Sequence, residues 1–119
     1  MKKVLIVEDE KILADLLAKK LKEESYDISL AHDGQEAFRK IREEKPDLIL
    51  LDIIMPILSG LDFLKKIKKE DVKKVIVVSV VKDKIRRKKA KEIGVKHYIS
   101  KPFRKESLLK EVNKILKRK

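Results

Sequence analysis

Three short apolar runs without polar alternation constrain the fold of this chain most. They are VLIV at 4–7, LILL at 48–51 and VIVV at 75–78, with two weaker runs at 28–31 and 98–99. A continuous run of Val, Ile and Leu is typical of a strand buried on both faces, because a strand with one face in water alternates apolar and polar residues. Parallel sheets covered by helices bury their strands in this way. The runs therefore predict a parallel sheet at the centre of the molecule.

Helical patterns separate the apolar runs. In each interval apolar residues recur every three or four positions, the spacing that places them on one face of an α-helix. The pattern is weakest around 83–93, where few apolar residues stand among many cations. The predicted apolar faces are those of Ile12, Leu13, Leu16, Leu17 and Leu21; Ala37, Phe38 and Ile41; Leu61, Leu64 and Ile67; Ile85, Ala90 and Ile93; and Leu108, Leu109, Val112, Ile115 and Leu116.

Strand and helix thus alternate five times along the 119 residues. This alternation predicts an α/β fold with right-handed crossovers. We expect a flavodoxin-like (βα)5 doubly wound fold, a five-stranded parallel sheet of order 2-1-3-4-5 with helices on both faces. The length suits one domain that needs no disulfide or metal to form a core. Residues 1–119 are therefore expected to be a single domain without an effector domain.

Composition excludes several classes of protein. The chain has no cysteine, which rules out thiolate metal sites and cysteine nucleophiles. No apolar segment approaches the ~18 residues that a membrane span needs, and the apolar run after the charged start is too short for a signal sequence. We therefore expect a soluble cytoplasmic protein. Charged residues make up 44% of the chain, a composition associated with thermostable proteins.

The positive charge is concentrated in the second half of the chain. Residues 1–60 hold 10 basic and 13 acidic side chains, whereas residues 61–119 hold 22 basic and 7 acidic ones. This excess suits an acidic partner, or a solvated surface adapted to heat. No aromatic residue is interleaved with the densest cations, which disfavours direct nucleic-acid binding. Those cations are Lys82, Lys84, Arg86, Arg87, Lys88, Lys89 and Lys91.

Polar residues follow the apolar runs. Glu8 and Asp9 follow the first run, Asp52 the third, Ser79 the fourth and Lys101 the fifth. Each alone could cap a helix, form a turn or lie on the surface. Because the carboxyl ends of parallel strands meet at one edge of a sheet, we expect all five to converge. Crowded carboxylates repel unless a cation neutralises them, and oxygen-only ligands favour Mg²⁺, beside which a lysine and a hydroxyl can hold phosphoryl oxygens.

These residues belong to a motif set that is specific to one family. The matching positions are Glu8, Asp9, Asp52, Gly60, Ser79, Tyr98, Lys101, Pro102 and Phe103. On these residues the sequence resembles the receiver domain of two-component response regulators, as a chemotaxis-regulator-like single domain. The resemblance covers the chain from Lys2 to the last helix.

The resemblance implies a phosphoacceptor and a magnesium site. Asp52 would accept a phosphoryl group from the phosphohistidine of a histidine kinase, forming a mixed acyl phosphate. Asp9 and Asp52 would ligate Mg²⁺ directly, Glu8 would act through a coordinated water, and Ile54 would offer its backbone carbonyl. The protein would then be a signalling domain of a phosphorelay that assists its own phosphorylation and dephosphorylation, and not an enzyme.

The resemblance also implies a switch. Lys101 would pair with the phosphoryl oxygens, and its bond to Pro102 is cis in this family. Ser79 would move to donate to the phosphoryl group, and Tyr98 would then turn inward. These changes would remodel the face formed by the fourth helix, the fifth strand and the fifth helix. A downstream protein would bind that face, and a phosphorylation-dependent homodimer is a further partner that the resemblance allows.

Some residues depart from the family's usual pattern. Val80 is branched where a small residue is usual, and we expect it to narrow access to Asp52. Ile54 and Val81 are apolar and cannot orient an attacking water, which predicts a long-lived phosphoryl group. A second function stays open, a phosphorylation-independent binding module whose basic face docks an acidic protein or nucleic acid. A metal-dependent phosphatase is disfavoured, because the sequence offers no second acid placed as general acid or base and no cap domain.

Overall fold

The computed structural model describes residues 1–53, 60–80 and 83–116. These residues form a five-stranded parallel sheet in the order β2-β1-β3-β4-β5. The order confirms the predicted flavodoxin-like, doubly wound fold. The strands are β1 (Lys3–Val7), β2 (Asp27–Ala31), β3 (Leu48–Asp52), β4 (Val75–Val80) and β5 (His97–Lys101).

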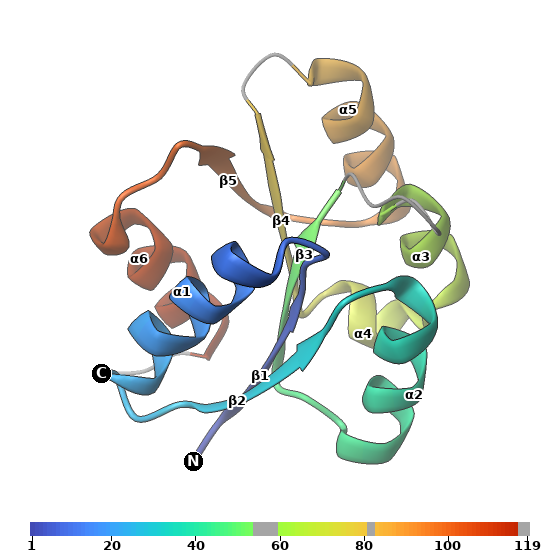
Figure 1. The fold of residues 1–119 in the computed structure, drawn as a ribbon. Coiled ribbons are helices and arrows are strands. Elements are labelled where there is room, and N and C mark those ends of the chain that lie inside the picture. Colours follow the sequence, from blue (N-terminus) through green and yellow to red (C-terminus); the bar gives the residue numbers. More distant parts are fainter. Residues whose placement is uncertain (54–59, 81–82, 117–119) are drawn as a thin grey trace.

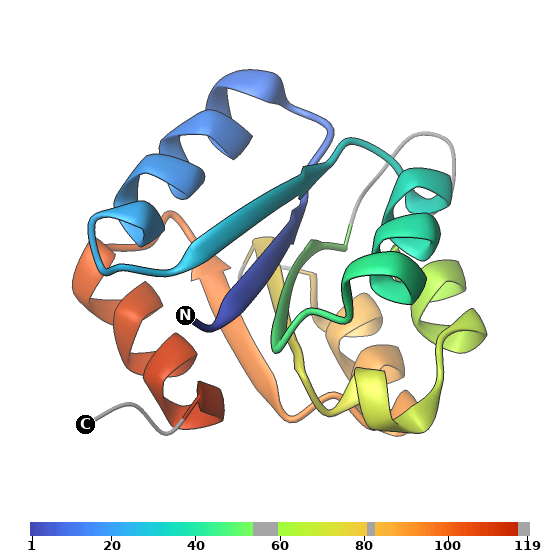
Figure 2. The ribbon, with the colours of Figure 1, turned by 90° about the horizontal axis from the view of Figure 1, so that it is seen from below.

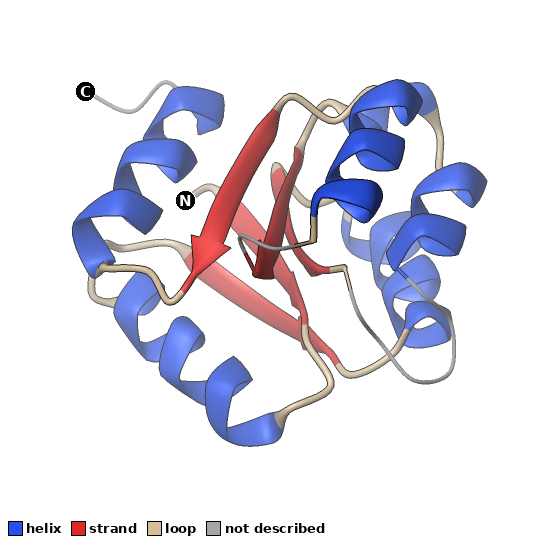
Figure 3. Cartoon of the chain, turned by 90° about the horizontal axis from the view of Figure 1, so that it is seen from above, coloured by secondary structure: helices blue, strands red, loops and turns tan. Residues whose placement is uncertain are grey.

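Helices cover both faces of the sheet. In the described parts of the chain they are α1 (Lys11–Lys22), α2 (Gly34–Glu44), α3 (Gly60–Lys66), α4 (Lys69–Val72), α5 (Lys84–Ile93) and α6 (Lys105–Leu116). Helices α1 and α6 lie on one face, and α2 to α5 lie on the other (Figure 1). Views from below and from above show the sheet between these two groups (Figures 2 and 3). None of these helices has the length and apolar character that crossing a membrane requires.

The apolar runs form the centre of the core. Strands β1 and β3 have neighbours on both sides, and their apolar residues are almost completely buried. Because successive side chains of a strand point to opposite faces, Leu5 and Val7 pack with α2 to α5, whereas Val4 and Ile6 pack with α1 and α6. Strands β2 and β5 are only half-buried because they are the edges of the sheet.

The buried face of helix α1 differs from the predicted apolar face. Leu17 and Leu21 are buried against the sheet, but Ile12 is 86% exposed and Leu16 is 47% exposed. The sequence pattern places all four on one face, and this placement is wrong for Ile12 and Leu16. At about 100° per residue Ile12 lies about 140° from Leu17 around the helix. The buried face is completed by small alanines instead, which leaves two large apolar side chains on the surface.

Two further helices differ from the sequence pattern. Helix α4, a single turn between α3 and β4, is not predicted by the pattern, although its Val72 is buried in the core. Helix α5, which corresponds to the predicted fourth helix, buries Ala90 but leaves Ile85 72% exposed. Helix α6 corresponds to the predicted fifth helix and buries Leu108 and Val112.

Gly60 fixes the chain where it leaves β3. Its backbone N–H donates to the carbonyl oxygen of Ile53 at 3.0 Å. A Cβ atom on residue 60 would lie 2.6 Å from the Cα and 2.7 Å from the oxygen of Ile53. A Cβ atom cannot approach non-bonded backbone atoms so closely, so only glycine fits here. This contact holds the chain directly after Asp52 and thereby limits how far the end of β3 can move.

The close contact predicts that Gly60→Ala destabilises the fold. The added methyl group must push the Ile53 backbone away, which is expected to lower the free energy of unfolding by about 1–3 kcal/mol, the range typical of overpacking. Urea unfolding followed by far-ultraviolet circular dichroism measures this loss. An unchanged midpoint would mean that the Gly60–Ile53 contact can open without cost.

Candidate functional site

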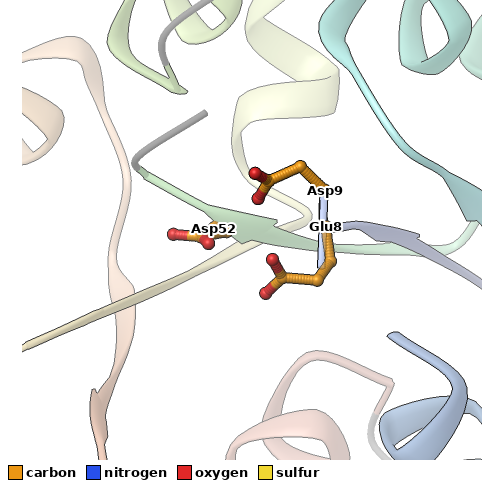
Figure 4. Close-up of side chains that lie close together, drawn as sticks. All are labelled: Glu8, Asp9 and Asp52. Carbon is orange, nitrogen blue, oxygen red and sulfur yellow. The ribbon is translucent and has the colours of Figure 1, made fainter. Parts of the chain in front are cut away.

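Three carboxyl groups meet at the ends of β1 and β3. Glu8 and Asp9 directly follow β1, and Asp52 is the last residue of β3. One ligand oxygen of each residue lies within 4.8 Å of the other two. Figure 4 shows the carboxyl groups of Glu8 and Asp9 turned toward Asp52. The convergence follows from the topology, because β1 and β3 are paired neighbours whose carboxyl ends lie side by side.

The carboxyl groups differ in burial and in partners. Glu8 is 2% exposed and Asp52 is 9% exposed, whereas Asp9 lies on the surface. The backbone N–H of Glu10 donates to Glu8 Oε2 at 3.2 Å. Lys101 Nζ lies 3.4 Å from Asp52 Oδ2 and 3.9 Å from Glu8 Oε1. The site therefore combines two buried acids, one exposed acid and a lysine between the two buried acids.

Lys101 reaches this site from the end of β5, with β4 between β5 and β3. The peptide bond between Lys101 and Pro102 is cis, as the family resemblance implies. The long lysine side chain spans the intervening strand and brings its ammonium group to Asp52. Among the sequence-predicted site residues, Glu8, Asp9, Asp52 and Lys101 thus come together in space.

Burial changes the acidity of Glu8. Loss of hydration, with a smaller contribution from the nearby Asp52, raises the pKa of Glu8 to about 8. The hydrogen bond from Glu10 and the charge of Lys101 oppose this shift without cancelling it. In the absence of a divalent cation, the Glu8 carboxyl group therefore keeps its proton in much of the protein population at neutral pH.

The donor set fits a small divalent cation. Its ligands are carboxylate oxygens, the donors that Mg²⁺ prefers. Burial is the main cause of the raised pKa of Glu8, and a divalent charge would offset the repulsion from Asp52 that adds to it. Asp9 is exposed, so its carboxyl group is open to solvent. The chemistry of these residues and their spacing therefore suit a magnesium site.

Ser79 lies on β4 and is 2% exposed. Its hydroxyl oxygen accepts a hydrogen bond from Arg87 Nε at 2.9 Å. Arg87 Nη2 also donates to Ser100 Oγ at 2.6 Å, and the guanidinium carbon lies 5.6 Å from the ring centroid of Tyr98. The sequence pattern identifies Arg87 only as one cation of a basic helix. In the structure its side chain links the hydroxyl group of Ser79 on β4 to that of Ser100 on β5.

Tyr98 lies on β5 and is half-buried against the core. Its hydroxyl donates to the carbonyl oxygen of Val95 at 2.9 Å, and burial raises its pKa. Its ring contacts the guanidinium of Arg87. Ser79 and Tyr98 are therefore linked to each other through one side chain of α5.

Several predicted features lie outside the described residues. They are the Ile54 carbonyl predicted as a metal ligand, Val81, and the cation Lys82. Val80 is described and its side chain is 45% exposed at the end of β4. Its predicted effect on access to Asp52 stays a prediction.

Comparison with known proteins identifies the family. A family model described as "Response regulator receiver domain" matches residues 4–113. The chain belongs to the response regulator receiver domain family. The resemblance drawn from the sequence motifs is thereby confirmed.

Solved receiver structures are similar along almost the whole chain. A two-component response regulator from Clostridium difficile has 30% identity and a TM-score of 0.91, covering 99% of this chain and 98% of that chain. The receiver domain of Francisella response regulator 1452 has 32% identity and a TM-score of 0.87, with the same coverage of 99% and 98%. The chemotaxis protein CheY4 of Vibrio cholerae has 26% identity and a TM-score of 0.88, covering 97% and 98%.

Membership assigns this chain to a general class of function. Receiver domains are signalling domains of two-component systems, which interact with histidine kinases and with downstream targets. They typically bind Mg²⁺ at an acidic pocket, and the acids Glu8, Asp9 and Asp52 form such a pocket here.

The raised pKa of Glu8 predicts a specific pH dependence of stability. Between 4.5, its ordinary pKa, and about 8 the folded protein binds more protons at Glu8 than the unfolded chain does. The metal-free protein should therefore lose stability as pH rises through this interval. Thermal unfolding with a chelator present, compared between wild type and Glu8→Gln, measures the effect.

The comparison isolates Glu8 because the other titrating groups are common to both proteins. The melting temperature of the wild type should fall relative to that of Glu8→Gln as pH rises. Parallel curves for the two proteins would contradict the raised pKa.

Proposed function

We propose that this chain is a phosphoryl-accepting receiver whose Asp52 takes a phosphoryl group from the phosphohistidine of a histidine kinase. One observation carries the proposal. Asp52 combines a carboxyl oxygen within 4.8 Å of oxygens of Glu8 and Asp9 with an ammonium group of Lys101 at 3.4 Å. Acids alone would suit a structural cation, but acids together with a lysine suit a site that receives further negative charge.

Each site residue has a distinct role in the proposed transfer. Asp9 and Asp52 would hold Mg²⁺ directly and Glu8 would hold it through a water. When bound, Mg²⁺ would neutralise the acids and the oxygens of the incoming phosphoryl group. An oxygen of Asp52 forms a bond to phosphorus while the bond from phosphorus to the kinase imidazole nitrogen breaks, and that nitrogen keeps the electron pair. Lys101 pairs with the phosphoryl oxygens.

The acyl phosphate then acts on the switch residues. It carries up to two negative charges and new acceptor oxygens. The Ser79 hydroxyl can turn toward these oxygens and donate a hydrogen bond to one of them. The response is carried to the face formed by α5, β5 and α6, where Lys84, Lys88 and Lys91 are exposed. We propose that an acidic protein partner binds this face.

The same exposed cations support the alternative function, in which such a partner binds whether or not Asp52 carries phosphate.

A groove beside Lys101 supports a docking position for the kinase. Its volume is about 400 Å³, and apolar side chains of α1, Val80 and Phe103 line it together with Lys101. Leu16 and Val80 are 47% and 45% exposed there. Since the phosphohistidine must come within bonding distance of Asp52, the donor protein must cover surface next to Lys101. We propose that an apolar face of the kinase packs on Leu16 and Val80.

The central prediction is that Asp52 alone becomes phosphorylated. Incubation with Mg²⁺ and acetyl phosphate or phosphoramidate should add the mass of one phosphoryl group to the wild type and none to Asp52→Asn, as read by intact mass spectrometry. Asp52→Asn should keep the fold because the replacement has nearly the same shape. Equal labelling of both proteins would contradict the assignment of Asp52.

If the wild type gains no mass, Val80→Ala separates two explanations. Labelling of that variant would mean that Val80 restricts access to Asp52. A continued lack of labelling would favour the phosphorylation-independent function. In that case Asp52→Asn should bind the acidic partner as well as the wild type does.

The docking position predicts a donor-specific defect. Leu16→Glu should slow transfer from a histidine kinase several-fold, because a charge in the apolar groove must be desolvated on binding. It should not slow phosphorylation by phosphoramidate, which needs no protein contact. Ile85→Glu is the matched control, since Ile85 is equally apolar and 72% exposed but lies on α5. Equal slowing by both variants, or none by Leu16→Glu, would place the kinase elsewhere.

A further inference from the structure

Arg87 contacts three residues of two strands with one side chain. Its Nε donates to Ser79 on β4 at 2.9 Å and its Nη2 donates to Ser100 on β5 at 2.6 Å. Its guanidinium lies 5.6 Å from the ring centroid of Tyr98. We infer that Arg87 is a positioning residue, a latch that holds Ser79 in the unphosphorylated conformation and opens when Asp52 is phosphorylated. The inference rests on the proposed function of Asp52.

The strength of the latch follows from its chemistry. A hydrogen bond with a charged donor is stronger than one between neutral groups, and Ser79 is almost completely buried where it accepts this bond. The guanidinium is a planar fork that offers only donors, so both serine oxygens must turn toward it. Arg87 therefore fixes the direction of the Ser79 hydroxyl oxygen toward α5.

The latch competes with the proposed role of Ser79 in phosphorylation. To bind a phosphoryl oxygen, Ser79 must aim its hydroxyl at Asp52 on β3, the strand that pairs with β4 on the side away from β5. Arg87, which also donates to Ser100, instead holds that hydroxyl oxygen on the side of α5. Two directions for one hydroxyl define two conformations, and a phosphoryl group shifts the balance because it contacts Ser79 in only one of them.

Opening the latch would pass the signal to α5. Once Ser79 turns away, Arg87 keeps Ser100 as an acceptor but no longer joins β4 to β5. Its contact with the Tyr98 ring then changes, since the same guanidinium makes both contacts. Arg87 belongs to α5, the helix of the basic face, so the position of that helix depends on the direction of the Ser79 hydroxyl.

The neighbouring residue provides a matched control. Arg86 carries the same charge on the same helix, but it is exposed and its Nη1 pairs with Asp83 at 3.0 Å. Loss of Arg86 therefore removes the same charge from the basic face without removing a bond to the sheet. Any effect that Arg87→Ala has and Arg86→Ala lacks belongs to the contacts of Arg87.

Tyrosine fluorescence gives a readout that does not depend on phosphorylation. The chain has no tryptophan and two tyrosines, so Tyr26→Phe leaves Tyr98 as the only emitter. In that background, Arg87→Ala and Ser79→Ala should shift the signal of the unphosphorylated protein in the same direction, and the double variant should shift it no further. Additive shifts would overturn the latch, as would the absence of any shift in Arg87→Ala.

Phosphorylation rates test the second half of the inference. With phosphoramidate and Mg²⁺, Arg87→Ala should be phosphorylated at least about tenfold faster than the parent, the lower end of what one hydrogen bond with a charged group represents. Arg86→Ala should match the parent. An equal or slower rate in Arg87→Ala would overturn the latch. Lack of phosphorylation in every protein would instead defeat the proposed function, while the fluorescence result still decides whether Arg87 holds Ser79.

Arg87→Lys guards against a loss of folding in Arg87→Ala. It keeps the charge but lacks the planar fork that serves two serines at once. Its tyrosine fluorescence and its rate of phosphorylation by phosphoramidate should lie between those of the parent and of Arg87→Ala. Parent-like values in Arg87→Lys would mean that charge alone acts, and would contradict a latch built on paired hydrogen bonds.

Discussion

The crowding of three carboxyl groups at the ends of β1 and β3 is the constraint on which the rest of this structure depends. Two of them, Glu8 and Asp52, are buried, and burial of like charges is unfavourable unless a cation or a proton offsets it. The ammonium group of Lys101, which reaches the site from β5, offsets part of this negative charge. A proton on Glu8 offsets more of it. A site balanced in this way suits the exchange of its proton for a divalent ion, which the proposed phosphoryl transfer requires.

The scaffold around the site keeps that crowding in place. Strands buried on both faces cannot move apart to relieve the repulsion, and the contact between Gly60 and Ile53 fixes the chain just beyond Asp52. The proposed switch residues lie instead on β4 and β5, where Arg87 joins Ser79 and Tyr98 by a hydrogen bond and a ring contact. In the proposed function, these two residues carry the response to the phosphoryl group.

The sequence alone predicts the sheet and much of the site, for a physical reason. Burial on both faces leaves an unbroken apolar run, and parallel topology brings the residues after such runs to one edge, so the convergence of Glu8, Asp52 and Lys101 follows from their positions in the chain. The contacts of Arg87 could not be predicted in this way. They depend on how α5 is rotated, and its apolar pattern is too weak to fix that rotation, as the exposed Ile85 illustrates. The exposed Ile12 has a similar cause, because small alanines rather than Ile12 form the contact of α1 with the sheet.

The most direct test of this account is whether one divalent ion binds between these carboxyl groups. Titration of the isotope-labelled protein with Mg²⁺, followed by amide resonances, should perturb residues at the ends of β1 and β3 and should saturate. Asp9→Asn should weaken binding by at least about tenfold, a loss in the range seen even for outer partners of metal ligands. Asp15→Asn, the same change at an exposed acid of α1, should not weaken it. Perturbation elsewhere in the sheet, or equal affinities for the two variants, would contradict the account.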